Sequence, residues 1–144
     1  MSSTPSRPQI PSDMKAFNQK LIAEFRANGG KLTGPMAGAR QPLLLTTTGA
    51  KSGVPRTVVV GYRMDGDRYL AIASNNGHDV APFWYRNLLQ EPTAVVEVGP
   101  DRFQVRARTA TPVERPQLAP KIDYLERQQA LTSREIPIVI LERI

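Results

Sequence analysis

Residues 43–57 read LLLTTTGAKSGVPRT, and this stretch decides how the chain is expected to fold. Its first part, Leu43–Thr48, predicts a strand, because a short apolar and β-branched run ahead of turn residues favours extended backbone. Gly49–Arg56 then brings two glycines and a proline, which are typical of a hairpin loop. A second strand is expected over Thr57–Met64. We therefore predict an antiparallel pair of strands joined by a basic loop.

Further strands follow in the same hairpin style. Asp65-Gly66-Asp67 is a tight-turn signal that leads into a third predicted strand, Arg68–Ser74. Thr93–Val98 and Arg102–Ala110 form another predicted hairpin, and the alternation of apolar and polar residues in its second half indicates one buried face. Ile138–Leu141 is uninterrupted and apolar, as expected for a strand that is covered on both sides.

Three segments are predicted to be helical. Ser12 or Asp13 can cap an amphipathic helix, which Asn28-Gly29-Gly30 then ends because glycine adopts positive φ easily. Phe83–Gln90 predicts a short helix, and Val113–Leu131 is helical in tendency but interrupted by two prolines. The apolar face of the first helix is predicted to consist of Met14, Phe17, Leu21, Ile22 and Phe25.

About six strands with flanking helices predict an α+β fold built on an antiparallel barrel. Residues 1–11 are rich in Ser, Thr and Pro and are expected to be a disordered leader. Residues 12–144 are expected to form a single domain that includes the N-terminal amphipathic helix.

Composition excludes several kinds of chemistry. The chain contains no cysteine, so disulfides, thiolate nucleophiles and Cys-ligated metals are ruled out, and a reducing cytoplasm is a compatible location. No arrangement of His, Cys and carboxylates of the hydrolase kind is present, and we predict no metal site. A formal charge of +6 favours anionic partners such as phosphates, nucleic acid, acidic lipid or a polyanionic cofactor.

The basic loop is the first candidate site. Its glycines allow turns that aim successive N–H groups into one concavity for an anion, and Lys51 and Arg56 add positive charge. It is not a P-loop, because the required spacing is absent and a strand follows instead of a helix. On composition alone, an ordinary exposed hairpin loop explains the same residues equally well.

The second candidate site runs from Ser74 into the helix that starts at Phe83. Its hydrogen-bonding residues lead to a helix N-terminus, where unpaired N–H groups favour anions or carbonyl oxygens. Trp84 is suited either to flank a planar ring system or to pack in the core with Tyr85, and packing is the more frequent role. We assign no role to His78, the sole histidine.

These two segments, in this order, resemble the deazaflavin-dependent nitroreductase family. The resemblance extends to Asn28-Gly29-Gly30 and to residues 132–137 before the last strand, and so covers nearly all of the chain beyond the leader. The matching residues are Leu44–Thr48, Gly49, Lys51–Gly53, Pro55, Arg56, Ala73, Ser74, Gly77, Pro82, Trp84, Tyr85, Asn87 and Leu88.

The resemblance implies a split β-barrel of the flavin-reductase or FMN-binding kind. It implies reduced coenzyme F-420 as cofactor, a deazaflavin with a phosphate and an oligoglutamate tail, and places Lys51 and Arg56 at the phosphate and tail carboxylates. The cofactor-binding residues predicted in this way are Lys51, Ser52, Gly53, Pro55, Arg56, Thr57, Ala73, Ser74, Asn75, Pro82, Phe83, Trp84 and Asn87.

The implied reaction is hydride transfer to an electron-poor small-molecule acceptor: a quinone, an enone or lactone, or a nitroaromatic compound. Ser74 and Tyr124 are the candidate proton donors, directly or through water. Members active on nitroimidazoles resemble this chain less at two positions, with lysine in place of Asn75 and tyrosine in place of Gly61. We therefore do not expect nitroimidazole activation.

Three alternatives stay open. An FMN-binding split-barrel oxidoreductase would share the fold and the phosphate site. A nucleic-acid-binding module is disfavoured, because the arginines of residues 102–108 have no interleaved aromatics for base stacking. The helix over residues 14–25 either contacts a membrane surface or packs on the barrel, and we expect packing. The chain is expected to be cytoplasmic, with membrane association open, and either monomeric or a homodimer.

Overall fold

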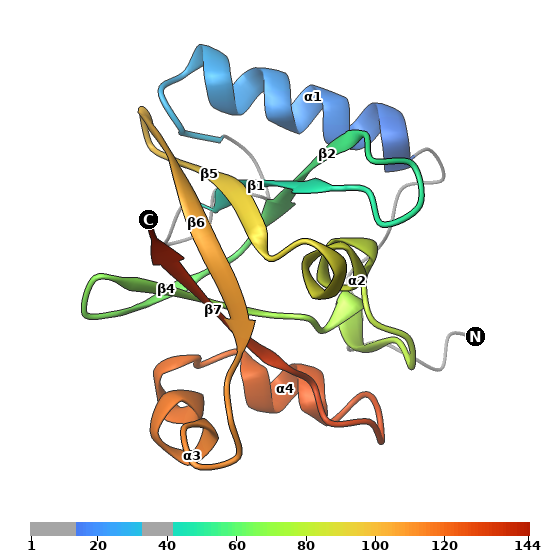
Figure 1. Cartoon of the computed structure of the whole chain (residues 1–144), viewed down its shortest axis with the longest axis vertical. Coiled ribbons are helices and arrows are strands. Elements are labelled where there is room, and N and C mark those ends of the chain that lie inside the picture. The colour runs from blue at the N-terminus through green and yellow to red at the C-terminus, as the bar shows by residue number, and fades with distance from the viewer. Residues whose placement is uncertain (1–13, 33–41) are drawn as a thin grey trace.

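The computed structural model describes residues 14–32 and 42–144 (Figure 1). The expected leader over residues 1–11, with the capping residues Ser12 and Asp13, lies outside the described residues. Strands are β1 Leu43–Thr48, β2 Pro55–Val60, β3 Arg63–Asp65, β4 Arg68–Ile72, β5 Thr93–Val98, β6 Asp101–Thr109 and β7 Ile138–Arg143. Helices are α1 Met14–Ala27, α2 Phe83–Gln90, α3 Arg115–Leu118 and α4 Leu125–Gln129, with short 3-10 turns η2 Asn75–Gly77 and η3 Ala119–Lys121.

All seven strands form one antiparallel sheet in the order β2-β1-β5-β6-β7-β4-β3. The edge strands β2 and β3 are separated along the chain only by Gly61 and Tyr62. Since consecutive Cα atoms are about 3.8 Å apart, these two residues hold the opposite edges near each other. The sheet therefore curls into a barrel, and the predicted α+β fold on a split antiparallel barrel is confirmed.

One predicted strand, Thr57–Met64, is wrong as a single element. Its first half belongs to β2, where Thr57 pairs with Thr46 of β1, and its second half is β3, where Met64 pairs with Tyr69 of β4. The sheet thus has seven strands where about six were expected. A glycine inside a strand pattern often marks a bend, and here Gly61 moves the chain from one sheet edge to the other.

Two apolar layers lie on the two faces of the sheet at β7. Val139 and Leu141 belong to the barrel interior, whereas Ile138 and Ile140 pack against the helices α3 and α4. All four side chains are buried, which confirms the prediction of a strand covered on both sides. The barrel interior is formed by Leu43, Leu45, Val60, Ala71, Ala73, Trp84, Leu88, Ala94, Val96, Phe103, Val105, Ala107, Val139 and Leu141.

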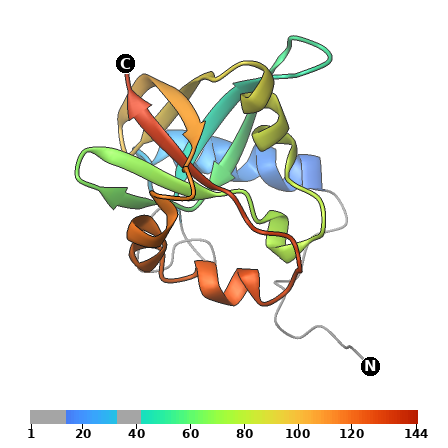
Figure 2. The same ribbon diagram turned by 60° about the horizontal axis from the view of Figure 1, so that its bottom comes forward.

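The helices cover two opposite ends of the barrel. α1 lies over β1 and β2, while α3 and α4 lie at the far end, below β4 and β7 (Figures 1 and 2). Phe25 of α1 is only 1% exposed and packs with Leu32 and Leu44. The apolar face of α1 therefore packs against the sheet. Among the described residues, no helix combines the length and the hydropathy needed to cross a bilayer.

The end of α1 abuts the turn between β5 and β6. Gly29 and Gly30 have positive φ angles of 63° and 91°, which confirms that they end the helix. A Cβ atom on Gly30 would lie 2.2 Å from the Cα of Gly99 in that turn. Only glycine permits this close approach of two backbone segments.

Candidate functional site

A cavity of about 790 Å³ opens between α1, the β1–β2 hairpin loop and α2. The loop contributes its whole basic stretch, α2 contributes its first two turns, and α1 contributes polar residues beside its apolar face. The lining residues are Asn18, Gln19, Ile22, Gly49, Ala50, Lys51, Ser52, Pro55, Arg56, Thr57, Val58, Phe83, Arg86 and Asn87. The sequence predicted this loop as a site, and the tertiary structure supplies the two helices that enclose it.

The cavity is strongly cationic. Lys51, Arg56 and Arg86 line it, and none of the lining residues is an Asp or Glu. Within residues 14–32 and 42–144, none of the three cations has a carboxylate oxygen within ion-pair distance. The guanidinium carbon of Arg86 lies 4.8 Å from the ring centroid of Phe83, which holds this cation at the cavity. Such an arrangement favours an anionic ligand.

Backbone amides of the loop are largely used inside the protein. Gly49 donates to the Val54 carbonyl at 2.9 Å, and Gly53 donates to the Gly49 carbonyl at 2.9 Å. The Ala50 backbone amide donates to Oδ1 of Asn87 at 2.9 Å, while the side-chain Nδ2 of Asn87 donates to the Thr47 hydroxyl at 3.0 Å. The expected concavity of successive free N–H groups is therefore not formed by these amides. The groups suited to hold an anion in the cavity are therefore side chains, and Asn87 connects α2 to the loop.

The structure brings together about half of the predicted cofactor-binding residues. The predicted residues that line the cavity are Lys51, Ser52, Pro55, Arg56, Thr57, Phe83 and Asn87. Those that do not line it are Gly53, Ala73, Ser74, Asn75, Pro82 and Trp84. Sequence reasoning missed Asn18, Gln19, Ile22, Val58 and Arg86, whereas Gly49 and Ala50 belong to the predicted basic loop but were not named as binding residues. Arg86 was detectable, because it follows Phe83 by three residues and helix neighbours share a face at that spacing.

Residues of the second candidate segment lie in the barrel wall and in the loop after β4. Trp84 is buried in the barrel interior and contacts Tyr85 edge to face at 6.4 Å, which matches the packing role. Ala73 is fully buried, and its amide donates to the Pro137 carbonyl at 3.0 Å. Ser74 is partly buried and directly precedes η2.

Tyr124 lies at the start of α4, away from the residues that line the cavity. Its hydroxyl is buried without a hydrogen-bond partner in the part of the chain that the structure describes. Burial raises the pKa of this phenol, so it stays protonated at neutral pH, while the Arg63 guanidinium lies 4.6 Å from its ring centroid. A Cβ atom added to Gly61 would lie 3.7 Å from the Tyr124 oxygen. The candidate proton donor Tyr124 and Gly61, where members active on nitroimidazoles have tyrosine, are thus neighbours.

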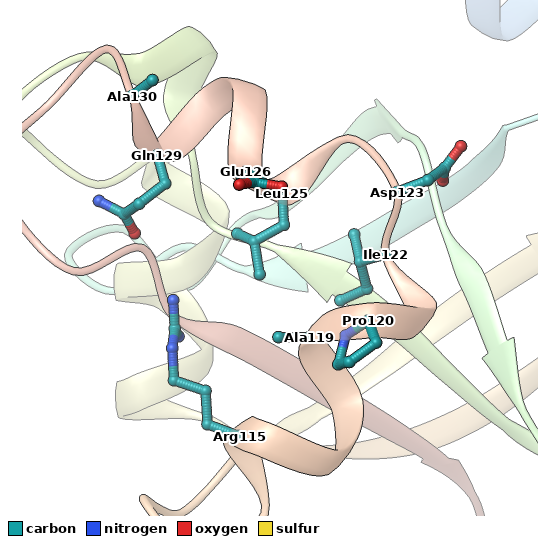
Figure 3. Close-up of a pocket in the computed structure, with 9 residues that line it drawn as sticks. All are labelled: Arg115, Ala119, Pro120, Ile122, Asp123, Leu125, Glu126, Gln129 and Ala130. Carbon is teal, nitrogen blue, oxygen red and sulfur yellow. The ribbon is translucent and has the colours of Figure 1, made fainter.

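A second hollow of about 690 Å³ lies between α3, η3 and α4 (Figure 3). Ile122 and Leu125 give it an apolar floor, and Arg115 reaches across from α3. None of the predicted site residues lines it. Among the described residues, no group of three His, Asp or Glu side chains is arranged to hold a metal ion.

A curled, split antiparallel barrel with a cationic cavity beside its first hairpin loop defines a split-barrel protein whose cavity suits an anionic ligand. Residues 18–143 match the F420H(2)-dependent quinone reductase family, and the chain belongs to that family. The expected F-420-dependent oxidoreductase is thereby confirmed. The family carries the quinone reductase name rather than the nitroreductase name suggested by the resemblance.

Relatives and solved structures agree with this assignment. An F420H(2)-dependent quinone reductase of Mycobacterium tuberculosis is 39% identical over 129 residues, which are 84% of this chain and 86% of the relative. A solved F420-H2-dependent reductase is 34% identical, with a TM-score of 0.62, covering 70% of this chain and 93% of its own. A structure described as a domain-swapped dimer is 30% identical, with a TM-score of 0.65, covering 92% and 100%.

Proposed function

We propose that this chain binds the phosphate-bearing tail of reduced coenzyme F-420 in the cavity beside the β1–β2 loop and reduces a quinone-type acceptor. One observation carries the assignment of the cavity: three cations line it without any carboxylate among the lining residues. The phosphate and the oligoglutamate tail are anions, so this donor set fits the cofactor.

The two arginines and the lysine divide the binding of these anions. Arg56 and Arg86 offer planar guanidinium groups that bind phosphate or carboxylate through two parallel hydrogen bonds, whereas Lys51 acts as a point charge. Ser52 and Thr57 add hydroxyl groups to the lining. Phe83, which is 76% exposed, is free to cover an apolar part of the ligand.

The cofactor supplies a hydride when it is bound, and the protein's part is to orient the reactants and provide a proton. The Tyr124 hydroxyl is one candidate proton donor, because the phenol carries its proton at neutral pH and lies beside Gly61. Ser74 is the other candidate. Since neither residue lines the described cavity, we place proton delivery on the acceptor side, directly or through water.

The acceptor is a quinone in the first instance, with enones and lactones as related electron-poor compounds. The family name supports the quinone. Nitroimidazoles are not expected to be reduced, because Gly61 and Asn75 each lack the side chain found in members with that activity. Apart from its chain neighbours, the Tyr124 oxygen at 3.7 Å is the one described heavy atom within 4 Å of a Cβ added at Gly61.

Assembly and location follow as further proposals. The similarity to a domain-swapped dimer supports a homodimer. Contact of α1 with a membrane surface stays a prediction, since its buried residue Phe25 already packs on the sheet. FMN is the alternative cofactor for the same site. A protein that is yellow as purified would favour FMN over coenzyme F-420.

The test is a fluorescence titration with coenzyme F-420, combined with oxidation of its reduced form by a menadione-type quinone. The Lys51→Ala, Arg56→Ala double variant should bind coenzyme F-420 at least about 100-fold more weakly, because it loses two charge-assisted contacts of about 1.5–3 kcal/mol each. Arg106 and Arg127 are exposed and lie outside the cavity, so their double alanine variant controls for net charge. Equal losses in both double variants would refute the cavity as the tail site.

A further inference from the structure

Arg134, which precedes β7, donates hydrogen bonds from its guanidinium group to the loop between β4 and α2. Its Nε donates to the His78 carbonyl at 2.9 Å. Its Nη2 donates to the carbonyls of Ala73 at 2.9 Å, Ser74 at 3.0 Å and Val80 at 3.3 Å. One side chain thereby satisfies four backbone acceptors of residues 73–80. Within the described residues it forms no ion pair.

Two neighbours of Arg134 hold the same loop. The Thr132 hydroxyl donates to Oδ1 of Asp79 at 2.9 Å. Leu131 packs so closely on Gly77 that an added Cβ would lie 2.5 Å from the Leu131 Cβ. Three residues of segment 131–134 therefore clamp one loop through three kinds of contact.

The clamped loop is strained. Asn75 has a φ angle of 48°, the one positive φ of a residue other than glycine within residues 14–32 and 42–144. Such a conformation persists only where its surroundings impose it, and it is most frequent at functional sites. Asn75 donates to the Val80 carbonyl at 3.1 Å, so the strained residue shares an acceptor with Arg134.

The loop joins two parts of the proposed machinery. It begins at Ser74, a candidate proton donor, and leads into α2, whose Phe83 and Arg86 line the cavity. α2 has its own attachments through Asn87 and through buried Trp84. Loosening the loop should therefore move the Ser74 end more than the cavity end.

We propose that Arg134 is a positioning residue of the reductase, which fixes the backbone at Ser74 for the transfer step without contacting the cofactor tail. This inference rests on the proposed function. An arginine is needed because its fork presents several N–H groups in fixed directions, whereas a lysine offers one ammonium group. A positive charge without this fork of N–H groups would therefore not hold the four carbonyls of the loop.

The experiment compares Arg134→Lys with Arg115→Lys. Arg115 is a matched control, since it also donates to a backbone carbonyl, that of Ile136 at 2.6 Å, whereas its ion pair is with Glu135 and no hydrogen bond or ion pair of the described residues joins it to residues 73–80. In Arg134→Lys, kcat for quinone reduction should fall about 10- to 100-fold, as small misplacements cost that much, with the Kd for coenzyme F-420 changed less than about twofold. Arg115→Lys should keep the wild-type kcat.

Hydrogen exchange reports the clamp independently of activity. The amides of Gly77 and His78 are bonded to the Ser74 and Asn75 carbonyls at 2.9 Å and 3.1 Å, and both should exchange faster in Arg134→Lys. Thr132→Val removes the bond to Asp79 and the hydroxyl oxygen that accepts from the Arg134 backbone amide at 3.3 Å, but leaves the four guanidinium bonds of Arg134. It should show a smaller change in the same direction, and it replaces Arg134→Lys as the test if that variant does not fold.

Two failures are distinguishable. A wild-type protein that neither binds nor oxidises reduced coenzyme F-420 overturns the proposed function, and the positioning role with it. An active wild type whose Arg134→Lys and Thr132→Val variants keep both kcat and exchange rates overturns the positioning role alone. If Arg134→Lys loses affinity for coenzyme F-420 by the same factor as kcat, the positioning role is also overturned, because the substitution would then have disturbed the tail site.

Discussion

The ion pair between α1 and β5 allows a quantitative prediction. Glu97 is 8% exposed and accepts hydrogen bonds from Nε and Nη2 of Arg26 at 3.0 Å and 2.8 Å. Arg102 approaches the same carboxylate at 3.5 Å. Replacing Arg26 by methionine keeps much of the apolar stem and leaves Glu97 with the weaker partner alone.

The magnitude follows from the burial of the two partners. Breaking a fully buried pair costs about 3–5 kcal/mol, because a charge is left buried without compensation. The Arg26 side chain is 47% exposed, so solvent screens the pair and the loss is reduced. We expect Arg26→Met to lower the free energy of unfolding by about 1–2 kcal/mol at neutral pH.

The pH dependence has a defined sign. Hydrogen bonding to Arg26 lowers the pKa of Glu97 below its ordinary value of 4.5. A carboxylate whose pKa is lower in the folded state stabilises the fold above its unfolded pKa and loses that contribution as the pH falls through the folded pKa. The difference between wild type and Arg26→Met should therefore be full above about pH 5 and shrink below pH 4.5.

The assay is urea unfolding at several pH values, with Arg106→Met as the control for an exposed arginine. A double-mutant cycle with Glu97→Gln isolates the pair and should give a coupling energy of about 1 kcal/mol. Equal stability of Arg26→Met and the wild type at pH 7, or a difference that does not change on acidification, would refute the reasoning. Affinity for coenzyme F-420 should fall about two- to fivefold, because Asn18 and Ile22 of α1 line the cavity.

Three further substitutions test other contacts. Gly30→Ala should destabilise the protein by about 2 kcal/mol or more in thermal unfolding, because the new Cβ would meet the Gly99 backbone at 2.2 Å. Asn87→Ala should cost about 1–3 kcal/mol and weaken F-420 binding in titration, because the Ala50 amide loses its acceptor. Tyr124→Phe should not lower the melting temperature, since it removes a buried hydroxyl without a described partner, yet should lower kcat if that hydroxyl donates the proton.

Local signals in the sequence were sufficient for most elements. Alternation in β6 and the unbroken apolar run of β7 predicted their burial, and Phe83–Gln90 was bounded correctly as a helix. The basic loop was predicted as a site because its residue types, two glycines and two cations, indicate a turn that can bind an anion. Secondary structure that depends on a local pattern can be predicted without the fold, because the backbone geometry of a helix or strand sets the period of its apolar side chains.

Contacts between distant segments decided the remainder. Nothing near Gly61 in the sequence shows that it joins opposite sheet edges, and nothing near Arg134 shows that residues 73–80 accept its hydrogen bonds. The cavity likewise required α1 and α2 to meet the β1–β2 loop, which placed Arg86 and Lys51 in one cavity and left Trp84 in the barrel interior. The sequence by itself determined which residues could bind an anion and which could pack. Tertiary structure alone decided which of them share a cavity, because the chain closes into a barrel only through pairings between residues far apart in sequence.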